Sequence, residues 1–318
     1  MSKTSKFGFE STTSDVLDGV DLSGKLALVT GASGGLGQET VRALAEHGAH
    51  VVMTARDMPK GERAAEAVRA STGNTQVEVM DLELDSLASV RSFAKRFLAK
   101  HEALHLLINN AGVMMCPLSQ TKDGFELQFG TNHLGHFVLT GHLAPALEKG
   151  APARIVNVSS GGHRRAPVQF DDPNFERSDY DKFVAYGQSK TANALFAVEL
   201  DRRLSDRGVR AFSIHPGAII TELGRHLEPG DFDQMRARFP GGKMVFKEIP
   251  QGAATQCYAA TSPDLDGKGG VYLEDCHIAE LNDDATRPHG VMSYALDPHN
   301  AERLWQLSEE LVGERFDF

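Results

Sequence analysis

The segment from Leu26 to Gly37, LALVTGASGGLG, limits the possible fold more than any other part of the chain. It reads as an apolar strand that runs into a glycine-rich turn and then into a helix. Glycine permits positive φ in such a turn and lets a pyrophosphate approach the backbone, beside the partial positive charge of the helix N-terminus. The turn therefore predicts a site for a dinucleotide phosphate. Its candidate residues are Gly31, Ser33, Gly35, Leu36 and Gly37.

The chain has 31 glycines among 318 residues, so an ordinary turn is the alternative reading of this segment taken by itself. Elsewhere apolar runs alternate with amphipathic stretches, as in βαβ units that build a parallel sheet covered on both faces. The predicted strands are residues 26–30, 50–54, 76–80, 104–109, 154–158, 209–215 and 269–273. The predicted helices are residues 36–47, 60–71, 86–101, 124–148, 184–206, 222–237 and 250–261. This order predicts an α/β fold with a doubly wound parallel sheet in three αβα layers.

The chain is long enough for one large core, since 41% of its residues are hydrophobic and 24% are charged. We expect residues 22–318 to form a single domain and residues 1–21 to form an N-terminal arm packed over its surface. Two stretches interrupt the alternating pattern. Residues 162–183 predict a long loop that frames a substrate site, and residues 222–249 predict either a mobile lid over that site or an ordinary surface segment.

The formal net charge of −10 argues against nucleic acid or an anionic membrane surface as a partner. Cys116, Cys257 and Cys276 are far apart and form no C-x-x-C motif, which favours reduced thiols over a disulfide framework or a zinc site. No apolar run approaches the ~18 residues of a membrane span, and the N-terminus lacks the apolar core of a signal peptide. We therefore expect a soluble cytoplasmic protein without a metal site.

Three further motifs follow the glycine-rich turn: LHLLINNAG at 104–112, RIVNVSS at 154–160 and YGQSK at 186–190. Together they resemble the short-chain dehydrogenase/reductase family over residues 22–280. The segments NNAGVMMCP, TNHLGHF and RIVNVSS are similar to the branch that contains retinol dehydrogenases. The resemblance implies a Rossmann-type fold and an oxidoreductase that transfers a hydride between a nicotinamide cofactor and a carbonyl or alcohol substrate.

Tyr186 and Lys190 are four residues apart, so a helix would place both side chains on one face. The resemblance makes Tyr186 the general acid/base. It implies that Lys190, together with the oxidised nicotinamide, lowers the pKa of Tyr186 and that Lys190 also binds the nicotinamide ribose. It further implies that Ser160, or its neighbour Ser159, binds the substrate oxygen, and that Asn132 holds a water that links Lys190 to solvent. Without the resemblance, the tyrosine and lysine would read as an exposed helix pair.

The resemblance assigns further residues to the cofactor. The residues expected near the adenine are Asp81 and Leu82. Those expected on the adenosine ribose side, where they also stabilise the sheet, are Asn109, Ala111 and Gly112. Those expected to hold the nicotinamide carboxamide are Pro216, Gly217 and Thr221.

The second predicted strand ends in VVMTARD, and its last residues bear on which dinucleotide binds. Enzymes selective for NAD place an acid at this position, but this chain has Ala55 followed by Arg56. A small residue leaves room for a 2′-phosphate and a guanidinium can bind it bidentately, so NADP(H) is favoured. Asp57 favours NAD(H), which stays open as the alternative cofactor.

These features predict an NADP(H)-dependent carbonyl reductase or alcohol dehydrogenase. Met114, Met115 and Phe246 indicate that its small-molecule substrate is apolar. The alternatives are an NAD-dependent secondary alcohol dehydrogenase and a catalytically silent dinucleotide sensor.

Three histidines near the motifs have no metal-ligand spacing to carboxylates or cysteines. His133 and His136 read as packing residues, and the role of His163 is left open. Members of the family often pair through two long helices, which are predicted here to begin near residues 124 and 184. A homo-oligomer is therefore allowed, although the extra loops could block that contact.

Overall fold

A computed structural model describes residues 6–237, 239–284 and 286–318. Its centre is one eight-stranded sheet in the order β3-β2-β1-β4-β5-β6-β7-β8. The strands are β1 (Leu26–Val29), β2 (His50–Ala55), β3 (Val77–Asp81), β4 (Leu106–Asn109), β5 (Ala153–Val158), β6 (Val209–His215), β7 (Val271–Glu274) and β8 (His277–Ile278). All neighbours pair in parallel except β7 and β8. The order reverses between β1 and β4, which confirms the predicted doubly wound α/β fold.

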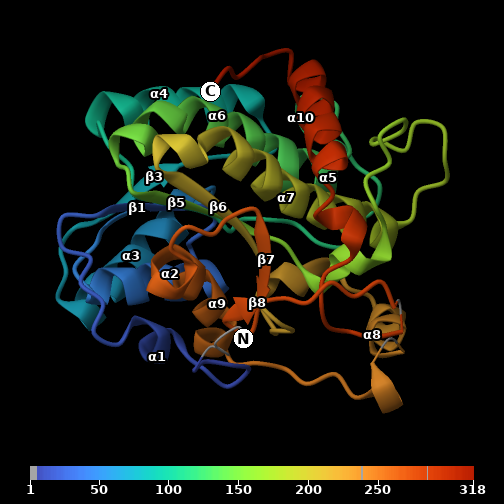
Figure 1. Ribbon diagram of the computed structural model, residues 1–318, viewed down its shortest axis with the longest axis horizontal. Helices are drawn as coiled ribbons and strands as arrows, with labels where there is room; N and C mark the ends of the chain where they lie inside the picture. The colour runs from blue at the N-terminus through green and yellow to red at the C-terminus, as the bar shows by residue number, and fades with distance from the viewer. Residues whose placement is uncertain (1–5, 238, 285) are drawn as a thin grey trace.

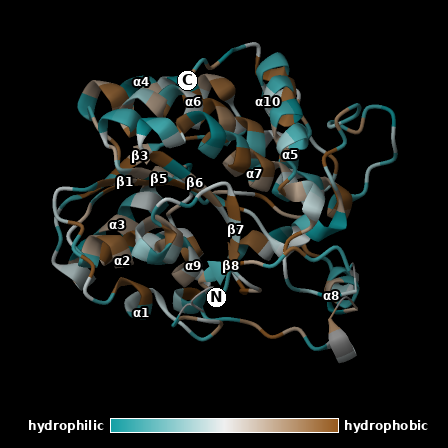
Figure 2. Ribbon diagram, in the orientation of Figure 1, coloured by the Kyte–Doolittle hydropathy of each residue, from teal (hydrophilic) through white to brown (hydrophobic). Residues whose placement is uncertain are grey.

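Helices cover both faces of this sheet and complete three layers (Figure 1). One face carries α1 (Thr13–Leu17), α2 (Gly35–Glu46), α3 (Met58–Thr72) and α9 (Ile249–Thr261). The other carries α4 (Leu87–Lys100), α6 (Gly135–Lys149) and α7 (Lys182–Leu204), with α10 (Pro298–Val312) packed against α7. The shorter helices are α5 (Leu127–Phe129) and α8 (Pro229–Arg236). Figure 2 shows hydrophobic residues concentrated along the strands, which pack into a core cluster on each side of the sheet.

The helix predicted over residues 124–148 is wrong as a single element. α5 begins only after Glu126, whose carboxylate accepts two N–H groups of the first turn. Residues Gly130–Leu134 then form a π-helical turn that leads into α6. A Cβ on Gly135 would lie 2.5 Å from the carbonyl oxygen of Leu84, so this close contact requires glycine. The predicted helix therefore has an irregular first part that its hydrophobic pattern does not reveal.

The helix predicted over residues 222–237 is also wrong in its bounds. Thr221 caps a 3-10 turn, Glu222–His226, and α8 begins only at Pro229. Proline has no N–H and its ring excludes a preceding helical turn, so a new helix starts there. The other predicted helices and strands begin and end within a few residues of the observed ones.

The predicted elements do not include α1, β8 or α10. On α10, the ring of Trp305 lies 4.9 Å from that of Phe137 in α6, and the Arg203 guanidinium of α7 lies 4.1 Å from the indole. Phe316, in the tail after α10, packs so closely on α6 that a Cβ on Gly141 would lie 2.5 Å from its ring. α10 and the tail therefore cover the outer side of α6 and α7.

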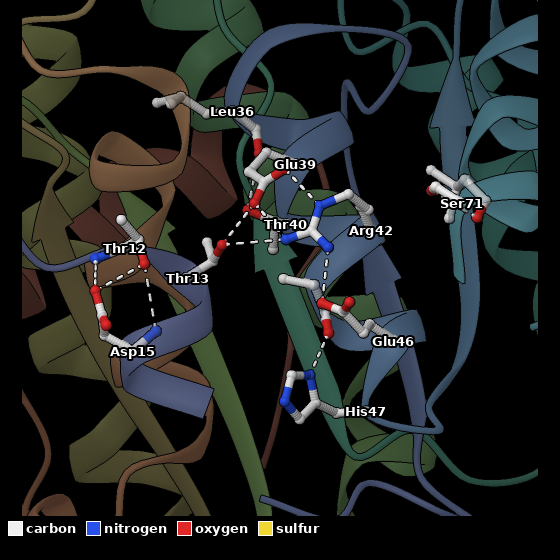
Figure 3. A network of polar contacts seen from close by, with 12 residues as sticks. Thr12, Thr13, Asp15, Leu36, Glu39, Thr40, Arg42, Glu46, His47 and Ser71 are labelled. Atoms are coloured by element: carbon white, nitrogen blue, oxygen red, sulfur yellow. Dashed lines mark hydrogen bonds and ion pairs between the residues drawn. The ribbon is translucent and has the colours of Figure 1, made fainter. Parts of the chain in front are cut away.

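The described part of the expected arm, residues 6–21, packs on α2 and α9, while residues 1–5 lie outside the described ranges. The Thr13 hydroxyl donates to the Glu39 carboxylate of α2 at 2.5 Å, and the same carboxylate pairs with Arg42 at 2.7 Å (Figure 3). These contacts hold the arm against the outer side of the helix that follows the glycine-rich turn.

Cys116, Cys257 and Cys276 are buried and free. In the described ranges, no group of three or more His, Cys, Asp or Glu side chains is placed to hold a metal ion. Within those same ranges, no helix has both the length and the apolar character needed to cross a membrane.

Replacing Trp305 by alanine should lower the free energy of unfolding by about 3–5 kcal/mol, because it leaves a cavity between α10, α6 and α7. Chemical denaturation measures this change, and Gln306→Ala on the exposed side of α10 is the control. A loss no larger than that of the control would show that α10 does not stabilise the fold.

Candidate active site

The glycine-rich turn joins β1 to α2. Gly31 and Gly35 have φ of +64° and +56°, a region that residues with a side chain rarely enter. A Cβ on Gly37 would lie 2.6 Å from the carbonyl oxygen of Gly31. Gly34 caps α2 without a side-chain hydrogen bond, which leaves N–H groups of the first turn for an anion. The turn, whose other predicted residues are Ser33 and Leu36, therefore fits a dinucleotide phosphate.

Behind this turn, the Thr30 hydroxyl connects three segments. It accepts the N–H groups of Asn110 at 2.9 Å and Ala111 at 3.0 Å, just after β4. It also lies 2.9 Å from Nε2 of His136, whose Nδ1 donates to the carbonyl of Asn132 at 3.0 Å. Because Nδ1 carries the proton, Thr30 donates to Nε2. His136, expected only to pack, thus links the nucleotide turn to the π-helical turn, and Asn110 is a contact that sequence reasoning missed.

At the end of β4, Asn109 is turned into the sheet, whereas Gly112 lies against the predicted catalytic side chains. The Asn109 side chain is buried and donates to Asn157 of β5 at 2.9 Å, so it stabilises the sheet and is closed to a ligand. A Cβ on Gly112 would lie 3.0 Å from Oδ1 of Asn132 and 3.5 Å from Nζ of Lys190. Gly112 therefore brings the chain against two predicted catalytic side chains.

The predicted adenine residues lie at the end of β3. The Asp81 carboxylate accepts a hydrogen bond from Arg96 at 2.5 Å, and this bond lowers the pKa of Asp81. The N–H of Leu82 donates to the carbonyl of Ala55 at 3.2 Å. The ends of β2 and β3 are thereby held side by side, as an adenosine site between them requires.

Arg56 is exposed directly after Ala55, which is buried. The side chain of Asp57 caps α3 by accepting the N–H of Lys60 at 2.9 Å. The carboxylate that favours NAD(H) in the sequence therefore has a structural partner, whereas the guanidinium is accessible.

Tyr186 and Lys190 lie one turn apart on α7, as their spacing predicts. The Lys190 ammonium lies 5.6 Å from the centre of the Tyr186 ring and donates to the carbonyl of Val158 at 3.0 Å. Burial raises the pKa of Tyr186 to about 12 and outweighs the lowering by its hydrogen bond with Ser160. Burial also lowers the pKa of Lys190 to about 7. Lys190 was expected to lower the pKa of Tyr186. Within the protein alone it does not, because burial disfavours both the tyrosinate and the lysine ammonium.

The Asn132 side chain lies in the π-helical turn and makes three hydrogen bonds within the protein. Its Oδ1 accepts the N–H of Val113 at 2.8 Å, and its Nδ2 donates to the carbonyl of Val113 at 2.9 Å and to the Ser189 hydroxyl at 3.0 Å. The contact of Asn132 with a water stays a prediction, for which its backbone carbonyl is a candidate acceptor. That carbonyl accepts one hydrogen bond from His136 and has a second lone pair.

Ser160 directly follows Ser159 after β5, and the two serines have different surroundings. The Ser160 hydroxyl accepts the N–H of Gly162 at 3.0 Å. A Cβ on Gly162 would lie 2.7 Å from the Tyr186 ring and 3.3 Å from Oγ of Ser160, so this glycine lets both residues lie together. Ser159 is buried and donates to the carbonyl of Lys190 at 2.7 Å. The geometry therefore favours Ser160 over Ser159 as the serine that faces a substrate.

Pro216 and Gly217 follow β6, and Thr221 ends this turn close to the glycine-rich turn. A buried lysine that sequence reasoning missed supports it. The ammonium of Lys247 pairs with Asp275 at 2.6 Å, and a Cβ on Gly217 would lie 2.9 Å from the aliphatic chain of Lys247. No local pattern could have found this pair, because its members meet only in the folded chain.

An apolar cluster surrounds the ring of Tyr186. Its buried members are Met115, Phe183 and Tyr186, and its partly buried members are Met114, Leu227 and Met235. The predicted lid supplies two of these, and Lys182 anchors the lid through Asp231 at 2.7 Å. Phe246, expected to contribute to an apolar site, is instead 37% exposed and lies outside the cluster. Residue 238 of the lid lies outside the described ranges.

A family model, described as short chain dehydrogenase, matches residues 25–231. Retinol dehydrogenase 12 of Mus musculus is 43% identical over 298 residues, which are 94% of this chain and 89% of that protein. Retinol dehydrogenase 11 of Homo sapiens is 44% identical with the same coverage. A solved structure of a protein from Mycobacterium Paratuberculosis is 36% identical, with a TM-score of 0.74 over 95% of this chain and 98% of that one.

The buried histidines predict a loss of stability in acid. Burial lowers the pKa of His133 to about 3 and those of His136 and His215 to about 4. Between pH 6.5 and 4 the unfolded chain binds more protons at these positions than the folded chain, so stability falls as the pH falls through this range. In denaturation curves, His133→Leu should reduce this dependence by about one proton. The exposed His299→Asn is the control, and an unchanged slope in His133→Leu would contradict the interpretation.

Proposed function

The chain belongs to the short-chain dehydrogenase family, and we propose that it is an NADP(H)-dependent reductase of apolar aldehydes and ketones that also oxidises the corresponding alcohols. Family membership gives the broader class, an NAD(P)-dependent oxidoreductase that acts on CH–OH groups. The observation that carries the finer proposal is that Tyr186 and Ser160 meet at the wall of an apolar cluster.

The chemistry follows from the protonation states of the buried groups. When bound, the cofactor supplies or accepts the hydride. The Ser160 hydroxyl orients the substrate oxygen, and Tyr186 donates a proton to this oxygen as a carbonyl is reduced. A pKa of about 12 keeps the Tyr186 hydroxyl protonated at neutral pH, which suits donation. Lys190, with a pKa of about 7, lies one turn away and can return a proton by way of a water that the carbonyl of Asn132 would hold as an acceptor.

The assignment of NADP(H) rests on the end of β2. Ala55 leaves space beside the adenosine ribose, and the exposed Arg56 supplies a cation for a 2′-phosphate. The Asp57 carboxylate, which favours NAD(H), already accepts the N–H of Lys60 at the start of α3, and this supports the proposal. The other residues proposed to hold the cofactor are Gly31, Ser33, Gly35, Leu36, Gly37, Asp81, Leu82, Ala111, Gly112, Tyr186, Lys190, Pro216, Gly217 and Thr221. Asn109 acts on the site only through the sheet.

The proposed substrate is apolar because the side chains around Tyr186 are methionine, leucine and phenylalanine. Methionine adapts to irregular shapes, so this apolar cluster suits a flexible chain better than a rigid polar ring. Two relatives are named retinol dehydrogenases, which makes retinol a natural test compound beside decanal.

A cytoplasmic location of the protein stays a prediction.

Tyr186→Phe should lower kcat for decanal reduction by about 10³-fold, because it removes the proton donor and leaves the ring in place. Fluorescence titration should show an unchanged Kd for NADPH. Tyr258→Phe is the matched control, since Tyr258 lies on α9, which packs on the other face of the sheet, and its hydroxyl contacts the Asp264 carboxylate at 3.4 Å. An unchanged kcat in Tyr186→Phe would overturn the mechanism.

Arg56→Ala should weaken NADPH about tenfold or more and change the Kd of NADH by less than about twofold, because only NADPH carries the phosphate that a charge-assisted bond would hold. The two titrations are compared with those of Arg63→Ala, an exposed arginine on α3. Equal losses for both cofactors would refute the assignment of Arg56.

A further inference from the structure

The peptide group that joins Ser160 to Gly161 is held at both of its polar atoms. The carbonyl of Ser160 accepts a hydrogen bond from Nδ1 of His163 at 2.7 Å and another from the backbone N–H of His163 at 3.0 Å. The N–H of Gly161, in the same peptide group, donates to Nδ1 of His215 at 3.0 Å. Two imidazoles therefore bind opposite edges of one peptide plane.

These contacts fix opposite tautomers in the two rings. Nε2 of His163 accepts the N–H of Met292 at 3.2 Å, so the proton of the neutral ring is on Nδ1, where it can be donated to Ser160. Nδ1 of His215 accepts from Gly161, so the proton of that ring is on Nε2. Neither ring could bind this peptide group in the same way if it were turned over.

The two rings come from different parts of the fold. His215 is the last residue of β6, which pairs with β5 directly before Ser160. His163 lies in the 3-10 turn after β5 and packs on Tyr272 of β7, with ring centres 4.9 Å apart. Met292 lies beyond the residues that the family model matches. The C-terminal part of the chain thus supports the loop that carries the proposed substrate-binding serine.

The orientation of this peptide group decides where the Ser160 hydroxyl points. The N–H of Gly162, one residue further on, donates to that hydroxyl at 3.0 Å. If this peptide group were released, ψ of Ser160 or φ of Gly161 could change by itself, and either change would swing the following chain and move this donor. Because Gly161 and Gly162 have no side chains to resist the rotation, the loop needs an external restraint.

We propose that His163 and His215 are positioning residues which together hold the Ser160–Gly161 peptide, so that the Ser160 hydroxyl stays aligned with Tyr186. The proposal rests on the proposed function only in that carbonyl reduction reports the alignment. Asparagine can supply either an N–H or an oxygen near the position of Nδ1, whereas leucine has nearly the same size and supplies neither.

The test compares His163→Leu with His163→Asn and His215→Leu with His215→Asn. Each leucine variant should lower kcat for decanal reduction with NADPH by about tenfold, and each asparagine variant should stay within about threefold of the parent. The double leucine variant should lose less than the product of the single losses, because both rings restrain the same peptide. Amide exchange of residues 159–163, measured without NADPH, should be faster in the leucine variants than in the asparagine variants.

Equal kcat losses in the leucine and asparagine variants, or no loss in any, would overturn the proposal. Equal amide exchange rates of residues 159–163 in the leucine and asparagine variants would also overturn it. Melting temperatures identify a variant that does not fold. Met292→Pro then serves as the second test, because φ of Met292 is −70° and proline fits there, while it removes the N–H that orients His163 and places its Cδ against Nε2, so that this ring must move. It should lower kcat by about threefold or more, and an unchanged kcat would count against the proposal. An active Tyr186→Phe would instead show that the proposed function fails.

Discussion

The hydroxyl of Thr30 is the contact on which the organisation of the site depends. It stands at the end of β1, where the glycine-rich turn begins, and it binds the chain after β4 and the imidazole of His136 at once. Through His136 it also reaches the carbonyl of Asn132. One oxygen thereby ties the nucleotide turn to the segment that packs beside Lys190. The hydroxyl of this threonine therefore fixes the segments after β1 and β4 relative to α6.

Burial, more than pairing of opposite charges, sets the protonation of the groups in this region. His136 and His215 have pKa values of about 4, Lys190 about 7 and Tyr186 about 12, each because its charged form is disfavoured in the protein interior. A neutral imidazole can donate one hydrogen bond and accept another, as the contacts of His136 require, and it leaves Nδ1 of His215 able to accept from Gly161. The same surroundings that make the site suitable for an apolar substrate thus keep its hydrogen-bonding network intact at neutral pH.

The features that could be predicted from the sequence are those that depend on local spacing of residues. The strands, the glycine-rich turn and the pair Tyr186 and Lys190 follow from periodicity and from motifs in order along the chain. The π-helical turn Gly130–Leu134 could not be predicted, because its apolar residues fit an ordinary helix and only close packing on a neighbouring loop reveals the change. The ion pair of Lys247 with Asp275 depends on contacts between distant segments. The amphipathic pattern of α10 was available, but it lies beyond the motifs that guided the interpretation.

The position of α10 also bears on assembly. The resemblance in the sequence allows pairing through the two long helices that the structure has as α6 and α7. Here Trp305 and Phe316 fill that face from within the same chain, and Gly141 is the point of closest approach. Side chains of α10 and of the tail thus occupy positions on α6 and α7 that a second copy would contact in such a pair. Another copy that approached these helices would therefore meet the side chains of α10 and of the tail first.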